Sequence, residues 1–282
     1  MKKIGIALGA GGARGLAHIL MLETLDELGL KPAYVSGASV GAIAGVLYCS
    51  GMTGKELREL FSELTASERN SVKNVFNLKW LDFIMPQFDG AGLLKAENFI
   101  NFLFGSISAR TFEELNIPLF VVAANFWTRE EIILKSGELV SALQASMSLP
   151  GIFAPVLMGD QVLIDGGAVN PVPFDILPDD CDLTIAIDVI GHRTAGPGLM
   201  PSLRDAIFNT FQIMEKSITR EKLRAARPDI YIAPDISDVR VLEFYKAESV
   251  FRQAQPAKDQ LKRELEERLN RKDRQKRRKN NQ

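Results

Sequence analysis

Short apolar segments alternate with helical patterns through the first fifty residues. Lys3 to Leu8 reads as a short strand and runs into a glycine-rich turn. Leucine and isoleucine positions at helical spacing follow, and Gly29 is placed to end that helix. A second short strand, Ala33 to Ser36, is followed by another glycine-containing turn and an apolar helix that reaches Cys49. Two successive strand–turn–helix units predict an α/β fold, with a parallel sheet that carries helices on its faces.

The remaining elements follow the same alternation less regularly. Thr53 and Glu56 have the spacing of a capping box, which predicts a helix starting after Thr53. We expect one α/β domain over residues 1–255 and a basic tail, helical or disordered, over residues 256–282. The pattern predicts strands at 119–126, 131–134, 162–164, 183–189 and 230–233, and helices at 137–148 and 203–226.

Composition narrows the class of protein. Of the 282 residues, 46% are apolar and 24% are charged, which is typical of a globular chain. Two cysteines are too few for a secreted disulfide framework, and two histidines make a histidine-built metal site improbable. The longest apolar runs have ten residues, whereas a membrane-spanning helix needs about 20. Glycines interrupt the apolar stretch that a signal peptide would need after Lys3, so we expect a reduced, cytoplasmic compartment.

The net charge of −1 hides an asymmetry. Residues 257–282 contain eleven basic and five acidic residues, a net charge of +6, so the rest of the chain carries −7. Leu261, Leu265 and Leu269 lie four apart on this segment. The segment is therefore either a helix that contacts an anionic membrane or a solvated end of the chain. We do not expect a nucleic-acid partner, because the basic residues are not interleaved with aromatic ones.

Gly37-Ala38-Ser39-Val40-Gly41 is a Gly-x-Ser-x-Gly sequence between a predicted strand and a predicted helix. A serine on such a sharp turn exposes its hydroxyl at the sheet edge, and the flanking glycines Gly37 and Gly41 make room for the strained backbone. The N-terminus of the following helix favours negative charge that develops there. We therefore interpret Ser39 as a nucleophile; the alternative is a tight turn with a capping serine.

The glycine-rich loop from Gly9 to Gly15 allows three interpretations. A P-loop is excluded because no Gly-Lys-Ser/Thr follows, and a dinucleotide fingerprint lacks its acidic residue about 20 positions on. The third is an oxyanion hole, in which consecutive glycines point backbone N–H groups at an anion. Because this loop and Ser39 follow adjacent strands, we expect them to meet at one edge of the sheet. A glycine-rich turn for close packing is the alternative.

Asp165 is the candidate base for this serine. It follows a predicted strand and precedes Gly166 and Gly167, which is also what an Asx-turn looks like. His192 is the rival, because a serine, an aspartate and then a histidine is the order of an α/β-hydrolase triad. A nucleophile on the second strand comes too early for that fold. We interpret His18 as a packing or capping residue.

These blocks, together with the stretch Ala145 to Pro155, resemble the patatin-like phospholipase family in its bacterial form. The resemblance implies a three-layer α/β sandwich with a mostly parallel central sheet, and a serine–aspartate dyad without histidine. By this resemblance, Ser39 would be the nucleophile, Asp165 would be its base, and Gly166 would belong to the aspartate motif. Ala10 stands where many members have glycine. The resemblance assigns the oxyanion N–H groups to Gly11 and Gly12, with Arg14 supporting their loop.

The activity that the resemblance implies is hydrolysis of lipid acyl esters through an acyl-enzyme, of the phospholipase A or lysophospholipase type. The substrate would be a lipid or another acyl ester, and no metal or organic cofactor is expected. The alternative is a catalytically silent module of the same family that binds lipid or a partner through the tail and the aromatic segment 76–88. That segment is either a lid or part of the core.

Overall fold

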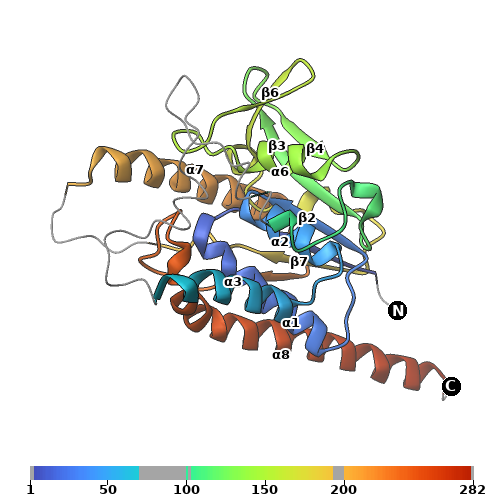
Figure 1. The fold of residues 1–282 in the computed structure, drawn as a ribbon. Helices are drawn as coiled ribbons and strands as arrows, with labels where there is room; N and C mark the ends of the chain where they lie inside the picture. The colour runs from blue at the N-terminus through green and yellow to red at the C-terminus, as the bar shows by residue number, and fades with distance from the viewer. Residues whose placement is uncertain (1–2, 70–99, 101–102, 193–199, 281–282) are drawn as a thin grey trace.

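A mixed sheet organises the computed structural model, which describes residues 3–69, 100, 103–192 and 200–280 (Figure 1). Within those residues the sheet has eight strands in the order β5-β6-β3-β2-β1-β7-β8, and β4 pairs with β3. The five strands from β3 to β8 along this order are mutually parallel, whereas β4, β5 and β6 are joined by antiparallel pairing. The strands are β1 (Ile4–Leu8), β2 (Tyr34–Ala38), β3 (Leu119–Asn125), β4 (Glu131–Leu134), β5 (Val156–Met158), β6 (Gln161–Asp165), β7 (Leu183–Ile187) and β8 (Ile230–Ile232).

Helices and 3-10 turns fill the intervals between strands. The predicted helices and most predicted strands are found within a few residues of their expected bounds, and Gly29, with φ of 63°, follows the first helix as expected. The helices are α1 (Ala17–Glu27), α2 (Val40–Cys49), α3 (Gly54–Arg69), α6 (Leu139–Met147), α7 (Leu203–Ala225) and α8 (Ala247–Asn280); the 3-10 turns are η1 (Gly12–Leu16), η2 (Phe112–Glu114), η3 (Gly166–Ala168), η4 (Phe174–Ile176) and η5 (Phe244–Lys246).

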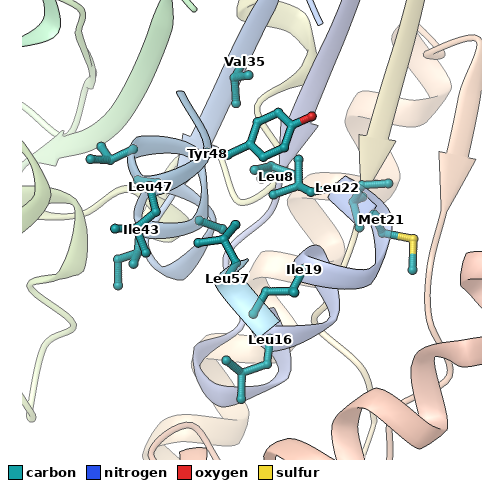
Figure 2. Close-up of a cluster of buried hydrophobic side chains, with 14 of the residues drawn as sticks. Leu8, Leu16, Ile19, Met21, Leu22, Val35, Ile43, Leu47, Tyr48 and Leu57 are labelled. Carbon is teal, nitrogen blue, oxygen red and sulfur yellow. The ribbon is translucent and has the colours of Figure 1, made fainter. Parts of the chain in front are cut away.

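The larger core lies on the face of the sheet covered by α1, α2, α3 and α8 (Figure 1). Because side chains alternate along a strand, Ile4, Ile6 and Leu8 of β1 all point to this face. They pack against apolar side chains of α1, α2 and α3, which Figure 2 shows meeting around Leu8. Burial of this face by several helices is the main contribution to the free energy of folding.

The opposite face of the sheet is lined by small residues. Ala7 of β1 and Ala186 of β7 pack there against Val172, Phe174 and Leu177. A Cβ at Gly5 would lie only 2.8 Å from the sulfur of Cys181, which explains why this face has small residues. The segment after β6 and part of α7 cover it. The predicted α/β sandwich with helices on both faces of a mostly parallel sheet is thereby confirmed.

Part of the last helix, α8, packs into the hydrophobic core. Leu261 and Leu265 are fully buried, and the Lys258 ammonium donates to Glu23 at 2.8 Å and to Glu27 at 2.7 Å, both on α1. The predicted domain boundary between residues 255 and 256 therefore falls inside a helix that packs against α1. Two of the three leucines of the stripe, Leu261 and Leu265, face the core, where they belong to the same cluster as apolar side chains of α1.

Two further differences concern short elements that the sequence pattern did not predict. The short strand β5 pairs with β6, and the second half of the glycine loop forms the 3-10 turn η1, which runs from Gly12 to Leu16. The aromatic segment 76–88 lies outside the described residues. None of the described helices combines the length and the apolar character needed to cross a membrane.

Candidate active site

Ser39 stands alone between the end of β2 and the start of α2. Its φ of 54° and ψ of −124° lie in a region that side-chain-bearing residues rarely adopt, which costs roughly 1–3 kcal/mol. Gly41 makes the tight turn feasible, because a Cβ there would lie 2.0 Å from the carbonyl oxygen of Leu8. A Cβ at Gly37 would lie 2.7 Å from backbone atoms of Ala42. The structure thus has the sharp strand–serine–helix turn that the sequence predicted, with Ser39 partly exposed.

Strand β3 brings Asp165 next to Ser39. Ala38, the last residue of β2, pairs with Val122 of β3, and Asp165, the last residue of β6, pairs with Ala123. At both positions the opposite edge of β3 is paired with β4. Strands β2 and β6 therefore pair with the same edge of β3, one after the other along its length. Ser39 and Asp165 are therefore placed by two consecutive residues of one strand, and the Ser39 hydroxyl hydrogen-bonds to the Asp165 carboxylate.

The Asp165 carboxyl group is 2% exposed. Burial raises its pKa to about 6, although hydrogen bonds from the Gly167 N–H and the Ser39 hydroxyl act in the opposite direction. The Gly167 N–H donates to Oδ1 at 2.7 Å and fixes the carboxylate orientation. A carboxylate with a pKa just below neutral is ionised at pH 7 and still basic enough to accept a proton from a neighbouring hydroxyl.

Ser146 of α6 supports the nucleophile, and sequence reasoning missed it. The Ser39 N–H donates to Ser146 Oγ at 2.9 Å, and the Ser146 hydroxyl donates to the Val122 carbonyl at 2.6 Å. Val122 therefore pairs with Ala38 and also accepts the hydrogen bond that orients Ser146, the residue that holds the Ser39 backbone. The only available signal was that Ser146 lies in the stretch 145–155 that resembled the family.

Residues of the glycine loop and of α2 line the space beside Ser39. Gly12 lines a small pocket together with Ser39 and Val40. Its φ is 58°, and a Cβ there would lie 2.5 Å from the Val241 carbonyl oxygen, so glycine is required. The N–H of Val40, at the first position of α2, has no acceptor within its own helix. Gly11, Gly12 and Val40 are therefore the candidate donors to an anion at Ser39, and sequence reasoning had named the two glycines only.

Arg14 lies beneath the glycine loop, with 1% of its surface exposed. Its Nε donates to the Gly11 carbonyl at 3.3 Å, and Nη1 donates to Gln212 of α7 at 3.5 Å. Arg14 therefore links the glycine loop to α7, and its support of an oxyanion hole stays a prediction.

The two histidines lie apart from the Ser39–Asp165 pair. The His18 ring is buried and its Nε2 contacts the Gly9 carbonyl at 2.8 Å, as a packing residue would. Its pKa is lowered to about 4 by burial. His192 pairs with Asp235 at 3.1 Å, with about half of its side chain exposed. The histidine of the alternative triad is therefore paired with a different aspartate.

Apolar surface adjoins the nucleophile. The small pocket at Ser39 shares Leu149 with a larger groove of about 410 Å³ along α7. Several apolar residues near this groove are exposed, among them Ile207 at 53% and Met214 at 50%. The groove is lined by Leu149, Pro150, Ala206, Ile207, Phe208, Thr210, Phe211 and Met214.

Curated relatives match this chain over part of their length. An uncharacterized NTE family protein of Mycobacterium bovis is 32% identical over 196 residues, covering 69% of this chain and 51% of the relative. Neuropathy target esterase sws of Drosophila melanogaster is 34% identical over 192 residues, covering 66% of this chain and 13% of the relative. The chain therefore spans about half the length, or less, of these relatives.

A solved structure and a family model also match. VipD from Legionella pneumophila is similar with a TM-score of 0.46 and 15% identity, covering 92% of this chain and 67% of VipD. The model of the patatin-like phospholipase family matches residues 6–178, which is more than half of the chain and includes the glycine loop, Ser39 and Asp165. The chain belongs to the patatin-like phospholipase family.

Proposed function

We propose that this protein hydrolyses acyl esters of lipids, of the phospholipase A or lysophospholipase type, with Ser39 as nucleophile and Asp165 as its base. The observation that carries the proposal is the hydrogen bond between the strained, partly exposed Ser39 and the buried Asp165 carboxylate. Membership of a phospholipase family supports the class of substrate.

The reaction follows from this geometry in two halves. Ser39 Oγ attacks the ester carbonyl carbon while its proton moves to Asp165, and the oxyanion is stabilised by the N–H groups of Gly11, Gly12 and Val40. The alcohol then leaves with the proton from Asp165. Water attacks the acyl-enzyme, gives a proton to Asp165, and the fatty acid leaves as Ser39 recovers the proton. Each oxyanion donor is worth on the order of a hundred- to thousand-fold in turnover.

The groove beside Ser39 fits the apolar part of such a substrate. Leu149 lines both the pocket at the nucleophile and the groove against α7, so an acyl chain that runs from one to the other would contact this apolar side chain. A groove of about 410 Å³ has the size of an ordinary ligand site.

Labelling with a fluorophosphonate tests the proposed nucleophile, because this reagent reacts only with an activated serine. We expect the wild type to be labelled and Ser39→Ala to be unlabelled. Ser141→Ala, which removes a hydroxyl from α6 away from Asp165, is the matched control and should be labelled like the wild type. A folded wild-type protein that resists labelling would favour the silent binding module instead.

A second prediction concerns the basic end of α8. Residues 271–282 contain seven basic residues and one acidic residue, so the whole net charge of +6 of the predicted tail lies beyond the buried Leu261 and Leu265. Attraction to an anionic membrane is worth about 1 kcal/mol per basic residue and weakens with salt. Deleting residues 271–282 should therefore leave the melting temperature and soluble-ester hydrolysis unchanged and weaken binding to phosphatidylserine vesicles at low salt. Equal vesicle binding by both proteins would contradict a membrane role for this segment.

A further inference from the structure

A second carboxylate is buried behind Asp165. Glu215 is on α7, is 5% exposed, and approaches the 3-10 turn η3 that follows Asp165. A Cβ built on Gly167 would lie 2.4 Å from Glu215 Oε1 and 3.1 Å from Asp165 Oδ1. Because these two distances add to about 5.5 Å, the two carboxylate oxygens can be no farther apart than that. Glu215 therefore occupies the space that a side chain at residue 167 would take.

The charged groups that act on Glu215 come from three other parts of the fold. They are Asp165 at the end of β6, Asp188 just after β7, and Arg14 of η1. One guanidinium thus faces three buried carboxyl groups. Three ionised carboxylates would leave a buried excess of negative charge, and burying uncompensated charge costs several kcal/mol, so one of the three should carry a proton.

Hydrogen-bond donors distinguish the three carboxyl groups. Asp165 accepts from Ser39 and Gly167, which stabilises its ionised form. Asp188 accepts from the Ile190 N–H at 2.9 Å and from the Tyr231 hydroxyl at 2.5 Å. Among the residues that the structure describes, none donates a hydrogen bond to Glu215. Glu215, which accepts no hydrogen bond from the described residues, is therefore the carboxyl group whose protonation costs the least free energy.

We propose that Glu215 is a positioning residue that keeps its proton at neutral pH and so leaves Asp165 as the ionised carboxylate at the nucleophile. Burial raises the pKa of Glu215 well above its ordinary value, the charges of Asp165 and Asp188 raise it further, and Arg14 opposes them. A neutral Glu215 adds no repulsion when the oxyanion forms at Ser39. This catalytic consequence rests on the proposed function, whereas the protonation of Glu215 does not.

The protonation can be tested by stability alone. A carboxyl group whose pKa is raised by folding binds more protons in the folded state, so its stabilising effect is full below the unfolded pKa and is lost as the pH rises towards the folded pKa. We expect the wild type to lose urea stability relative to Glu215→Gln as the pH rises from about 5 to about 9. Glu221→Gln, on the exposed side of the same helix, should show no such trend, because folding lowers the pKa of Glu221. A pH-independent difference between wild type and Glu215→Gln would overturn the proposal.

Two further measurements keep the test decisive. If Glu215→Gln does not fold, Glu215→Met removes the same titrating group with an apolar side chain and should show the same trend. Infrared difference spectra of wild type minus variant at about pH 8 should contain the C=O band of a protonated carboxylic acid, because Asp165 is ionised there. Absence of that band would also overturn the proposal.

The pH profile of ester hydrolysis connects the protonation to catalysis. Glutamine imitates a neutral glutamic acid, so the acidic limb of kcat/KM in Glu215→Gln should stay within about 0.3 pH unit of the wild type. A limb lowered by about one unit or more would show that Glu215 carries a negative charge next to Asp165, and the proposal would be wrong. A wild type without hydrolytic activity contradicts the proposed function and leaves the stability and infrared tests valid.

Discussion

Asp165→Asn should remove nearly all ester hydrolysis while the protein keeps its fold. Asparagine has almost the same shape and can accept a hydrogen bond from Ser39, but it cannot take up the proton that Ser39 must lose. We expect kcat to fall by on the order of a thousandfold or more, as in other sites that lose their base. Ser39→Ala should cause a similar loss, and the double variant should be no worse than either single one, because both changes destroy one proton-transfer unit.

His192→Ala is the matched control for this experiment. The His192 ring is half exposed and paired with Asp235, so its removal should leave activity within about tenfold of the wild type. Circular dichroism and melting curves of every variant separate lost chemistry from lost structure. If folded His192→Ala is as inactive as Ser39→Ala, Asp165 is not the base and the site is a triad.

Gly41→Ala should damage both stability and activity. The new methyl group would overlap the Leu8 carbonyl oxygen, with only 2.0 Å between them, so α2 must move away from β1. Overpacking of this kind costs up to about 3 kcal/mol in urea unfolding. Because Ser39 precedes α2 directly, a shift of about 1 Å at the nucleophile should also reduce kcat by roughly a hundredfold.

Gly45→Ala tests whether the effect at Gly41 is specific. Gly45 lies one turn farther along α2, and the closest atom to a Cβ there is the end of the Leu119 side chain, at 2.9 Å, with Val35 at an ordinary contact distance of 3.5 Å. Alanine also favours the helix by about 1 kcal/mol over glycine, so the change in unfolding free energy should be small. Equal losses in both variants would mean that α2 tolerates no side chain at either glycine, and the close approach to β1 would not explain Gly41.

The parts of the site that could be predicted from sequence are those set by local backbone conformation. Ser39 was found because a strand, two glycines and a helix surround it within a few residues, and Asp165 because it ends a strand before two glycines. Ser146 reaches the site from the last turn of α6, and Glu215 reaches it from the middle of α7. Their local sequence patterns are those of ordinary helices, so their contacts with the site become visible only when distant elements pack together.

The end of the chain shows a second limit of sequence reasoning. The net charge of residues 257–282 favoured an independent tail, but that charge is concentrated beyond residue 270. The three leucines four apart predicted an amphipathic helix correctly and left open what it contacts. The ion pairs of Lys258 with Glu23 and Glu27 join residues more than 230 positions apart, a separation that no local pattern can indicate.

The packing of α8 on α1 has a consequence for biosynthesis. Leu261 and Leu265 belong to the same core as α1, and α8 also contacts η1, the turn that carries the glycine loop. While the chain is being made, the part of α1 that contacts α8 stays uncovered until α8 has left the ribosome. The nascent protein therefore completes its core, and the support of its glycine loop, only after nearly every other element has been synthesised.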